Sequence, residues 1–116
     1  MSDSTFYDNW TTQLRKGLLE LAILNSVSGG PLYGYDIVRR LADLDSLVIT
    51  EGTVYPILSR LRNEEYVETY IEESSAGPPR KYYRLTARGR EELRRMNQHW
   101  QRLHDALGTI RKERAR

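Results

Sequence analysis

The run from Glu51 to Asn63 constrains the fold more than any other segment, because its apolar residues follow one helical stripe. They recur at spacings of three and four residues: Val54, Ile57, Leu58 and Leu61. This spacing is typical of the buried face of an α-helix. Pro56 fits a helix only near its first turns, so we expect the helix to begin between Thr50 and Thr53.

The opposite face of this helix is polar and has no carboxylate between Gly52 and Asn63. It combines small and hydrogen-bonding groups with two guanidinium groups: Gly52, Tyr55, Pro56, Ser59, Arg60, Arg62 and Asn63. Solvated helix faces more often mix Glu with Lys. The pattern is therefore compatible with two interpretations, an ordinary surface helix or a helix that enters the major groove of DNA.

After Asn63 the periodicity changes from that of a helix to that of a strand. Apolar and polar residues alternate over 67–72 and again over 81–85, and residues 73–79 between them are rich in Ser, Gly and Pro. This predicts a β-hairpin with Arg80 and Lys81 at its tip. A helix over 33–43 and a connector over 44–50 are expected before Glu51. A helix-turn-helix followed by a basic hairpin is a winged helix, so the expected class is α+β, mainly α.

The first helix, expected over 12–28 and ended by Gly29, Gly30 and Pro31, has two apolar faces. Leu14, Leu18 and Leu21 form one, and Leu19, Ile23 and Val27 form the other. Both apolar faces must be buried, and a chain of 116 residues has few other elements to bury them. We therefore expect one face to contact a second subunit. Residues 1–12, with three aromatic side chains, are expected to be a short extension that docks on another surface.

The last helix, expected over 87–112 with Thr86 as its N-cap, carries a heptad seam. The seam consists of Leu93, Met96, Trp100, Leu103, Leu107 and Ile110. It either packs on its own domain or joins two chains. A helix of about 25 residues spans roughly 37 Å, which is longer than the small domain beside it, so dimerisation is favoured. The expected organisation is an extension over 1–12, a winged domain over 13–86, and a dimerisation helix with a basic tail over 87–116.

Composition and residue spacing exclude several classes of function. The chain has no cysteine, its two histidines lie five residues apart, and no nucleophile or phosphate-binding loop can be assembled, so we expect neither an enzyme nor a metal or other cofactor. No apolar run approaches a membrane span, which favours a cytoplasmic, nucleoid-associated protein. Residues 80–116 hold 12 of the 18 basic side chains and 4 of the 16 acidic ones. Such a segment either attracts an anionic partner or merely keeps a helix soluble.

Four blocks of the chain resemble PadR-type transcriptional regulators. They are Gln13–Leu24, Tyr33–Ile37, Glu51–Leu61 and Arg80–Thr86, the last followed by Gly89. The single short C-terminal helix is similar to that of the compact subgroup that includes multidrug-responsive repressors. The resemblance implies a dimeric winged-helix repressor that leaves double-stranded operator DNA when a small effector binds. Residues 1–12 fall outside the shared pattern.

These patterns assign candidate roles to individual residues. Tyr55, Ser59 and Asn63 are expected at base edges, with Pro56 stiffening the helix tip, and the expected phosphate contacts are Thr53, Arg60, Arg62, Arg80 and Lys81. The expected dimer contacts are Leu14, Leu18 and the six residues of the heptad seam. The alternative function is that of a winged-helix adaptor that binds proteins through its aromatic N-terminal segment and has no effector.

The effector site is expected at Trp100, because an indole is bulky for a heptad seam. Two symmetry-related indoles would hold the helices apart and leave a slot for a planar aromatic molecule. Met96 and Leu103 would form its walls and Leu18 one end. The alternative is that Trp100 simply fills core volume.

Overall fold

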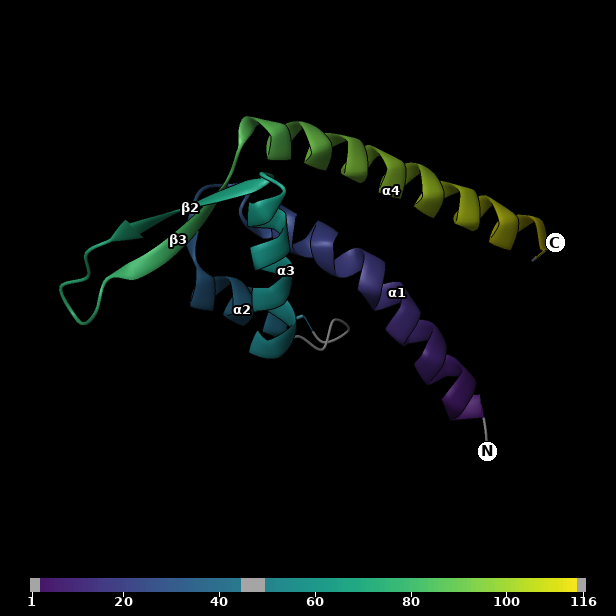
Figure 1. The fold of residues 1–116 in the computed structure, drawn as a ribbon. Coiled ribbons are helices and arrows are strands. Elements are labelled where there is room, and N and C mark those ends of the chain that lie inside the picture. The colour runs from purple at the N-terminus through teal and green to yellow at the C-terminus, as the bar shows by residue number, and fades with distance from the viewer. Residues whose placement is uncertain (1–2, 45–49, 115–116) are drawn as a thin grey trace.

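The computed structural model describes residues 3–44 and 50–114 and has the expected winged-helix architecture (Figure 1). The elements in chain order are α1 (Asp3–Ser26), β1 (Leu32–Tyr33), α2 (Gly34–Ala42), α3 (Glu51–Asn63), β2 (Val67–Glu72), β3 (Arg80–Leu85) and α4 (Ala87–Arg114). The helices α2 and α3 and the β2–β3 hairpin form the body. From it, α1 and α4 project as two long arms that diverge toward the chain ends. The mainly helical α+β class is confirmed.

The helix α3 begins at Glu51, within the range that the position of Pro56 predicted. Thr50 has extended backbone angles, and its carbonyl oxygen accepts hydrogen bonds from the amides of Thr53 and Val54 at 3.0 Å. Pro56 is thus the sixth residue of the helix, near its start. Most of the predicted connector over 44–50 lies outside the described residues.

The three strands form an antiparallel sheet in the order β1-β3-β2. Val67 pairs with Leu85 and Glu72 with Arg80, which confirms the hairpin and its loop over 73–79. The strand β1 is a correction, since the sequence predicted a helix from residue 33, whereas Leu32 and Tyr33 pair with Tyr83 and Tyr82. Two residues are too few to produce a periodic signal, and the helix begins at Gly34 instead.

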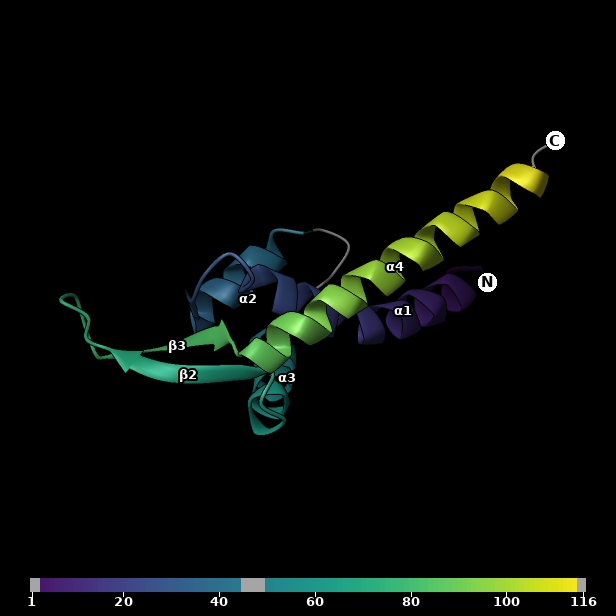
Figure 2. The same cartoon turned by 90° about the horizontal axis from the view of Figure 1, so that it is seen from above.

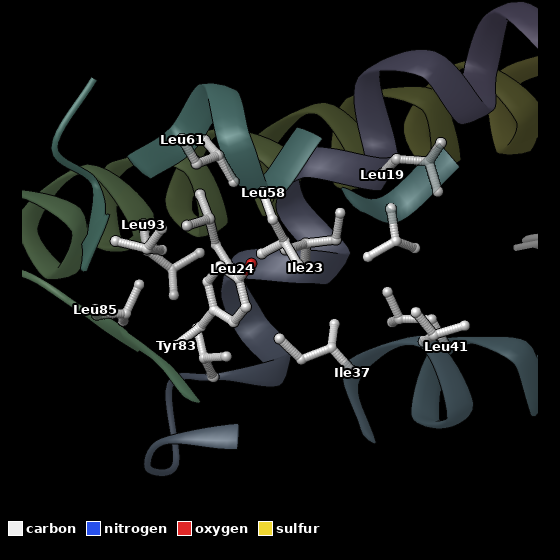
Figure 3. Close-up of a cluster of buried hydrophobic side chains, with 14 residues drawn as sticks. Leu19, Ile23, Leu24, Ile37, Leu41, Leu58, Leu61, Tyr83, Leu85 and Leu93 are labelled. Atoms are coloured by element: carbon white, nitrogen blue, oxygen red, sulfur yellow. The ribbon is translucent and has the colours of Figure 1, made fainter. Parts of the chain in front are cut away.

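One apolar core joins all the helices to the inner face of the sheet (Figure 3). It draws on one face each of α1, α2 and α3, on β2 and β3, and on the start of α4. Its buried residues are Leu19, Ile23, Leu24, Val27, Ile37, Val38, Leu41, Val54, Leu58, Leu61, Val67, Tyr83, Leu85 and Leu93. The predicted inner faces of α2 and α3 are confirmed, as is the buried face of Leu19, Ile23 and Val27, although Val27 lies just past the end of α1.

The first helix is longer than predicted, because α1 begins at Asp3 rather than Thr12 and ends at Ser26. Residues 3–16 contain neither glycine nor proline, so nothing interrupts the helix before Gly17. The hydroxyl groups of Thr11 and Thr12 both donate to the carbonyl oxygen of Asp8, within the helix. The predicted extension is therefore the outer part of an arm and not a separate segment.

A compact joint connects the end of α3 to the start of α4. The Thr86 hydroxyl accepts a hydrogen bond from the Gly89 amide at 2.9 Å and donates one to the carbonyl oxygen of Glu65 at 2.6 Å. The Thr86 amide donates to the carbonyl oxygen of Tyr66 at 3.2 Å. Thr86 is thus the predicted N-cap of α4 and also holds the turn that follows α3. Glu65, in that turn, has a φ of 66°.

Candidate nucleic-acid interface

The outer face of α3 is a row of exposed residues. Gly52, Pro56, Ser59 and Asn63 are exposed, whereas Val54, Leu58 and Leu61 on the opposite side are buried. Viewed from above, α3 lies at one edge of the body and the β2–β3 hairpin extends away from it (Figure 2). The face that the sequence marked as polar is therefore free to meet a partner.

The two arginines of α3 lie on the flanks of this row. The Arg60 guanidinium forms an ion pair with the carboxylate of Glu20 on α1. Arg62 lies on the other flank, where it borders a hollow shared with Glu68 of β2 and Arg88 of α4. Both arginines are exposed, but Arg60 already has an anionic partner in the free protein.

Tyr55 joins α3 to α2 instead of standing in the exposed row. Its ring lies over Gly34, where an added Cβ atom would be 3.1 Å from the ring edge of Tyr55 and 3.3 Å from that of Tyr83. An added Cβ atom would push these rings aside by a few tenths of an ångström, so glycine favours this close approach of α2. Burial, and then the nearby Glu51 carboxylate, raise the pKa of the Tyr55 hydroxyl, which is protonated at neutral pH like any tyrosine and can donate a hydrogen bond.

The outer face of the sheet carries a row of three tyrosines that sequence reasoning missed. The ring centroids of Tyr33 and Tyr82 are 6.0 Å apart, and those of Tyr82 and Tyr70 are 5.6 Å apart and stacked. The Arg80 guanidinium lies 4.8 Å from the centre of the Tyr33 ring. Arg84 lies over Tyr70 and forms an ion pair with Glu68 at 2.7 Å. The alternating pattern placed Tyr70 and Tyr82 on one side of the hairpin, but only the register brings them together.

Of the two basic residues predicted at the hairpin tip, Lys81 is the less engaged. Arg80 is exposed but rests on Tyr33, and a cation over an aromatic face is held by about 0.5–1 kcal/mol. Lys81 is exposed and pairs in register with Ile71, which is itself exposed. The Lys81 ammonium group is therefore more available than the Arg80 guanidinium to contact an anion outside the chain.

A second candidate site is an apolar groove between the two arms, with a volume of about 660 Å³. The four residues predicted to bind an effector all line it: Leu18, Met96, Trp100 and Leu103. Its polar rim consists of Glu92, Arg95, Gln98, His99 and Arg102. At the inner end of the arms, the amides of Asn25 and Asn97 exchange two hydrogen bonds of 3.0 Å, which ties α1 to α4.

The predicted dimer seam divides into a covered and an uncovered half. Leu93 is buried in the core of its own chain, and Met96 and Trp100 are half-buried. Leu103, Leu107 and Ile110 are 45%, 52% and 56% exposed, and Leu14 of α1 is 41% exposed. The inner half of the seam thus packs on its own domain, as one interpretation of the sequence had it, while the outer half has no cover within the described chain.

Two kinds of site are absent from the part of the chain that the structure describes. Residues 3–44 and 50–114 contain no cluster of three or more His, Asp or Glu side chains arranged to hold a metal ion. No helix in these ranges is both long and apolar enough to cross a membrane.

Comparison with known proteins identifies the family. The model of the PadR-like family of transcriptional regulators matches residues 23–95, which hold α2, α3, the hairpin and the start of α4. The chain belongs to the PadR-like family. A Lysinibacillus sphaericus protein is 31% identical over 94 residues, which cover 79% of this chain and 86% of that protein.

Solved PadR-like structures share the fold. A PadR-like transcription factor from Bacteroides fragilis has 38% identity and a TM-score of 0.72, with 88% of this chain and 98% of that chain covered. A PadR-like regulator from Bacillus cereus has 35% identity and a TM-score of 0.78, with 84% and 95% covered. Bacillus subtilis PadR, solved in complex with operator DNA, has 28% identity and a TM-score of 0.61, with 68% and 45% covered. Membership in this family confirms the prediction of a DNA-binding regulator and not an enzyme.

Proposed function

We propose that this PadR-like regulator binds a specific operator as a homodimer and acts as a repressor that a small planar aromatic molecule releases. The observation that carries DNA binding is the exposed polar row of α3, which no other element of the described chain covers. A helix about 10–12 Å across fits a major groove about 12 Å wide. The operator complex of Bacillus subtilis PadR is consistent with this use of the fold.

The placement of each side chain supports a division of roles. Ser59 and Asn63 point outward and would read base edges, while Thr53 near the start of α3, Arg62 near its end and Lys81 on the hairpin would contact phosphates. Pro56 and Tyr55 would hold the tip of α3 rigid, with the Tyr55 hydroxyl available as a donor. Arg60 reaches a phosphate only by exchanging the Glu20 carboxylate for it, and Arg80 only by leaving Tyr33.

A homodimer is supported by the uncovered half of the α4 seam and by Leu14 and Leu18 on α1. Exposed large apolar residues in a row are uncommon on a monomer and mark a protein interface. Two-fold symmetry would present two copies of α3 to two operator half-sites.

Effector control is supported by the groove at Trp100. Its volume lies in the usual range for small-molecule sites, roughly 300–1,000 Å³, and one wall is an indole on which a planar ring stacks. The groove is built on α4, and the joint at Thr86 ties α4 to the turn after α3. A ligand that changes the angle between the arms would therefore move the two copies of α3 relative to each other and weaken operator binding.

The proposal is tested by measuring affinity for promoter and random DNA over a range of salt concentrations. Ser59→Ala should cost roughly 1–3 kcal/mol on the operator and little on random DNA. Lys81→Ala should weaken binding to both DNAs and reduce the slope of log affinity against log salt concentration by about one. Lys112→Ala makes the same charge change near the end of α4 and should have neither effect.

The alternative is a protein-binding adaptor, and the exposure of Phe6, Tyr7 and Trp10 favours it. An adaptor would bind operator and random DNA equally and weakly, and Ser59→Ala would not affect the two differently. That result would contradict sequence-specific DNA binding.

A further inference from the structure

The ion pair between Arg60 and Glu20 joins the helix α3 to a different helix, α1. Other arginine pairs of the described helices, such as that of Arg94 with Glu91, lie within a single helix. The Arg60 side chain is 47% exposed and that of Glu20 is 31% exposed, so the carboxylate is the more covered of the two. The helix α3 therefore carries a cation that the fold neutralises before any DNA binds.

Arg60 lies on the flank of the exposed row and not within it. Its neighbour Ser59 belongs to the row, and Asn63 follows on the same side of the helix. In the proposed complex this row enters the major groove, and the phosphates of the two DNA strands run along the flanks of the helix. A phosphate therefore comes within reach of Arg60 only when α3 is fully inserted on the side of α1.

The surroundings of Glu20 favour the pair in the free protein. Glu20 borders a hollow of about 170 Å³ between α1, α3 and α4, together with the apolar side chains of Leu24, Leu61 and Met96. Two further carboxylates line this hollow, those of Glu64 and Glu92. Negative charge from several carboxylates attracts the Arg60 guanidinium, and without it the carboxylates repel one another. Removing Arg60 from Glu20 therefore costs more than separating an isolated surface ion pair.

Operator and random DNA act differently on this pair. Random DNA is held by contacts with phosphates that do not depend on sequence, and α3 does not seat fully in the groove. The Arg60 guanidinium then stays with Glu20 and contributes no positive charge to binding. On the operator, full insertion brings a phosphate to Arg60, and charge-assisted hydrogen bonds to the phosphate replace those to the carboxylate.

We propose that Glu20 is a specificity-determining residue, which withholds Arg60 from random DNA and releases it on the operator. Glu20 does not contact DNA itself, so it is a positioning residue that acts through Arg60. The inference rests on the proposed DNA binding by α3 and extends it. The difference in affinity between operator and random DNA then depends in part on a contact between α1 and α3.

The variant Glu20→Gln tests the proposal, because it frees Arg60 and adds one phosphate contact on random DNA. Affinity for random DNA should rise about threefold to tenfold, and the slope of log affinity against log salt concentration should steepen by about 0.9. On the operator, where Arg60 already contacts a phosphate, this slope should stay unchanged and the affinity should rise by less. A slope on random DNA equal to that of the wild type overturns the proposal.

Two control variants separate the ion pair from a general effect of charge. Glu91→Gln makes the same charge change and frees Arg94 on α4, and it should leave the slope on random DNA unchanged. In an Arg60→Gln background, Glu20→Gln should change neither slope. A slope that steepens equally in either control would assign the effect to net charge and contradict a role that acts through Arg60.

A second measurement leaves Glu20 unchanged and so does not depend on the folding of a variant at that position. The side-chain Nε–H signal of Arg60 in the NMR spectrum is assigned by its loss in Arg60→Gln. It should keep its free-protein position on saturation with random DNA and shift on saturation with the operator. Equal shifts with both DNAs reject the role of Glu20 alone, since the operator is still preferred. A wild-type chain with no preference for the operator rejects the proposed function and this role together.

Discussion

The carbonyl oxygen of Tyr66 lies 1.9 Å from the position that a Cβ atom on Gly89 would occupy. The start of α4 thus rests directly on the backbone of the turn that follows α3. Arg88 strengthens the contact, because its guanidinium lies 4.7 Å from the centre of the Tyr66 ring and donates to the Tyr66 hydroxyl at 3.3 Å. Together with the hydrogen bonds of Thr86, these contacts fix the angle between α3 and α4.

Gly89→Ala should therefore destabilise the fold despite the better helix propensity of alanine. The obstructing atom belongs to the backbone and cannot rotate away, so we expect a loss of about 2–4 kcal/mol in the free energy of unfolding, measured by urea titration. Gly108→Ala is the matched control, since nothing lies within 4 Å of its added Cβ atom and the helix should gain up to about 1 kcal/mol. Equal effects of the two substitutions would contradict the tight joint.

The hairpin and α3 were predictable because their signals are local. The stripe of Val54, Leu58 and Leu61 is contained in eight residues, and the alternation over 67–72 and 80–85 sets which side of each strand faces inward. These periods follow from backbone geometry, so a single segment reveals them without knowledge of its neighbours. Thr86 as an N-cap was predictable for the same reason.

The remaining features depend on contacts between distant segments. The pairing of Leu32 with Tyr83 and the close approach of Gly89 to Tyr66 join residues that no local period relates. The ion pair of Arg60 with Glu20 spans α3 and α1, so the sequence marked Arg60 only as a free cation. The early start of α1 was missed because its aromatic residues were taken as a docking segment, whereas a helix also presents them on one side.

Leu103→Glu should separate the dimer without unfolding the monomer. The side chain is 45% exposed in the single chain, so a carboxylate there remains solvated, but in the proposed interface it would be buried without a partner at a cost of several kcal/mol. Sedimentation should show a monomer with native circular dichroism and lost operator binding. Thr109→Glu adds the same charge to the opposite side of α4 and should remain dimeric. A Leu103→Glu protein that stays dimeric would place the interface elsewhere.

Alkaline pH should weaken the packing between α2, α3 and the sheet. Burial raises the pKa of both the Tyr55 and the Tyr83 hydroxyl, although Arg62 lowers that of Tyr83 in part. Their stabilising contribution is complete below the unfolded value of about 10, and it is lost as pH rises because the unfolded chain releases these protons first.

The free energy of unfolding should therefore fall as the pH rises through about 10 and above, and less steeply in the Tyr55→Phe, Tyr83→Phe double variant. Tyr35→Phe, at an exposed ring, controls for the removal of a hydroxyl group. An identical slope in the double variant would show that other groups cause the alkaline loss.

The effector proposal predicts that Trp100 is needed for ligand binding but not for DNA binding. Trp100 is half-buried and lines the groove, and none of the residues that line this groove belongs to α3, so Trp100→Ala should leave operator affinity unchanged in the absence of ligand. Binding of a planar cationic dye, followed by dye anisotropy, should fall about tenfold or more, because each stacked ring face contributes roughly 0.5–1.5 kcal/mol beyond burial. Trp100→Phe keeps an aromatic face and should retain most of the affinity.

A second measurement uses tryptophan fluorescence. Quenching by the dye, measured in a Trp10→Phe background, should disappear when Trp100 is replaced. Undiminished dye affinity in Trp100→Ala would mean that the indole only fills volume between the arms.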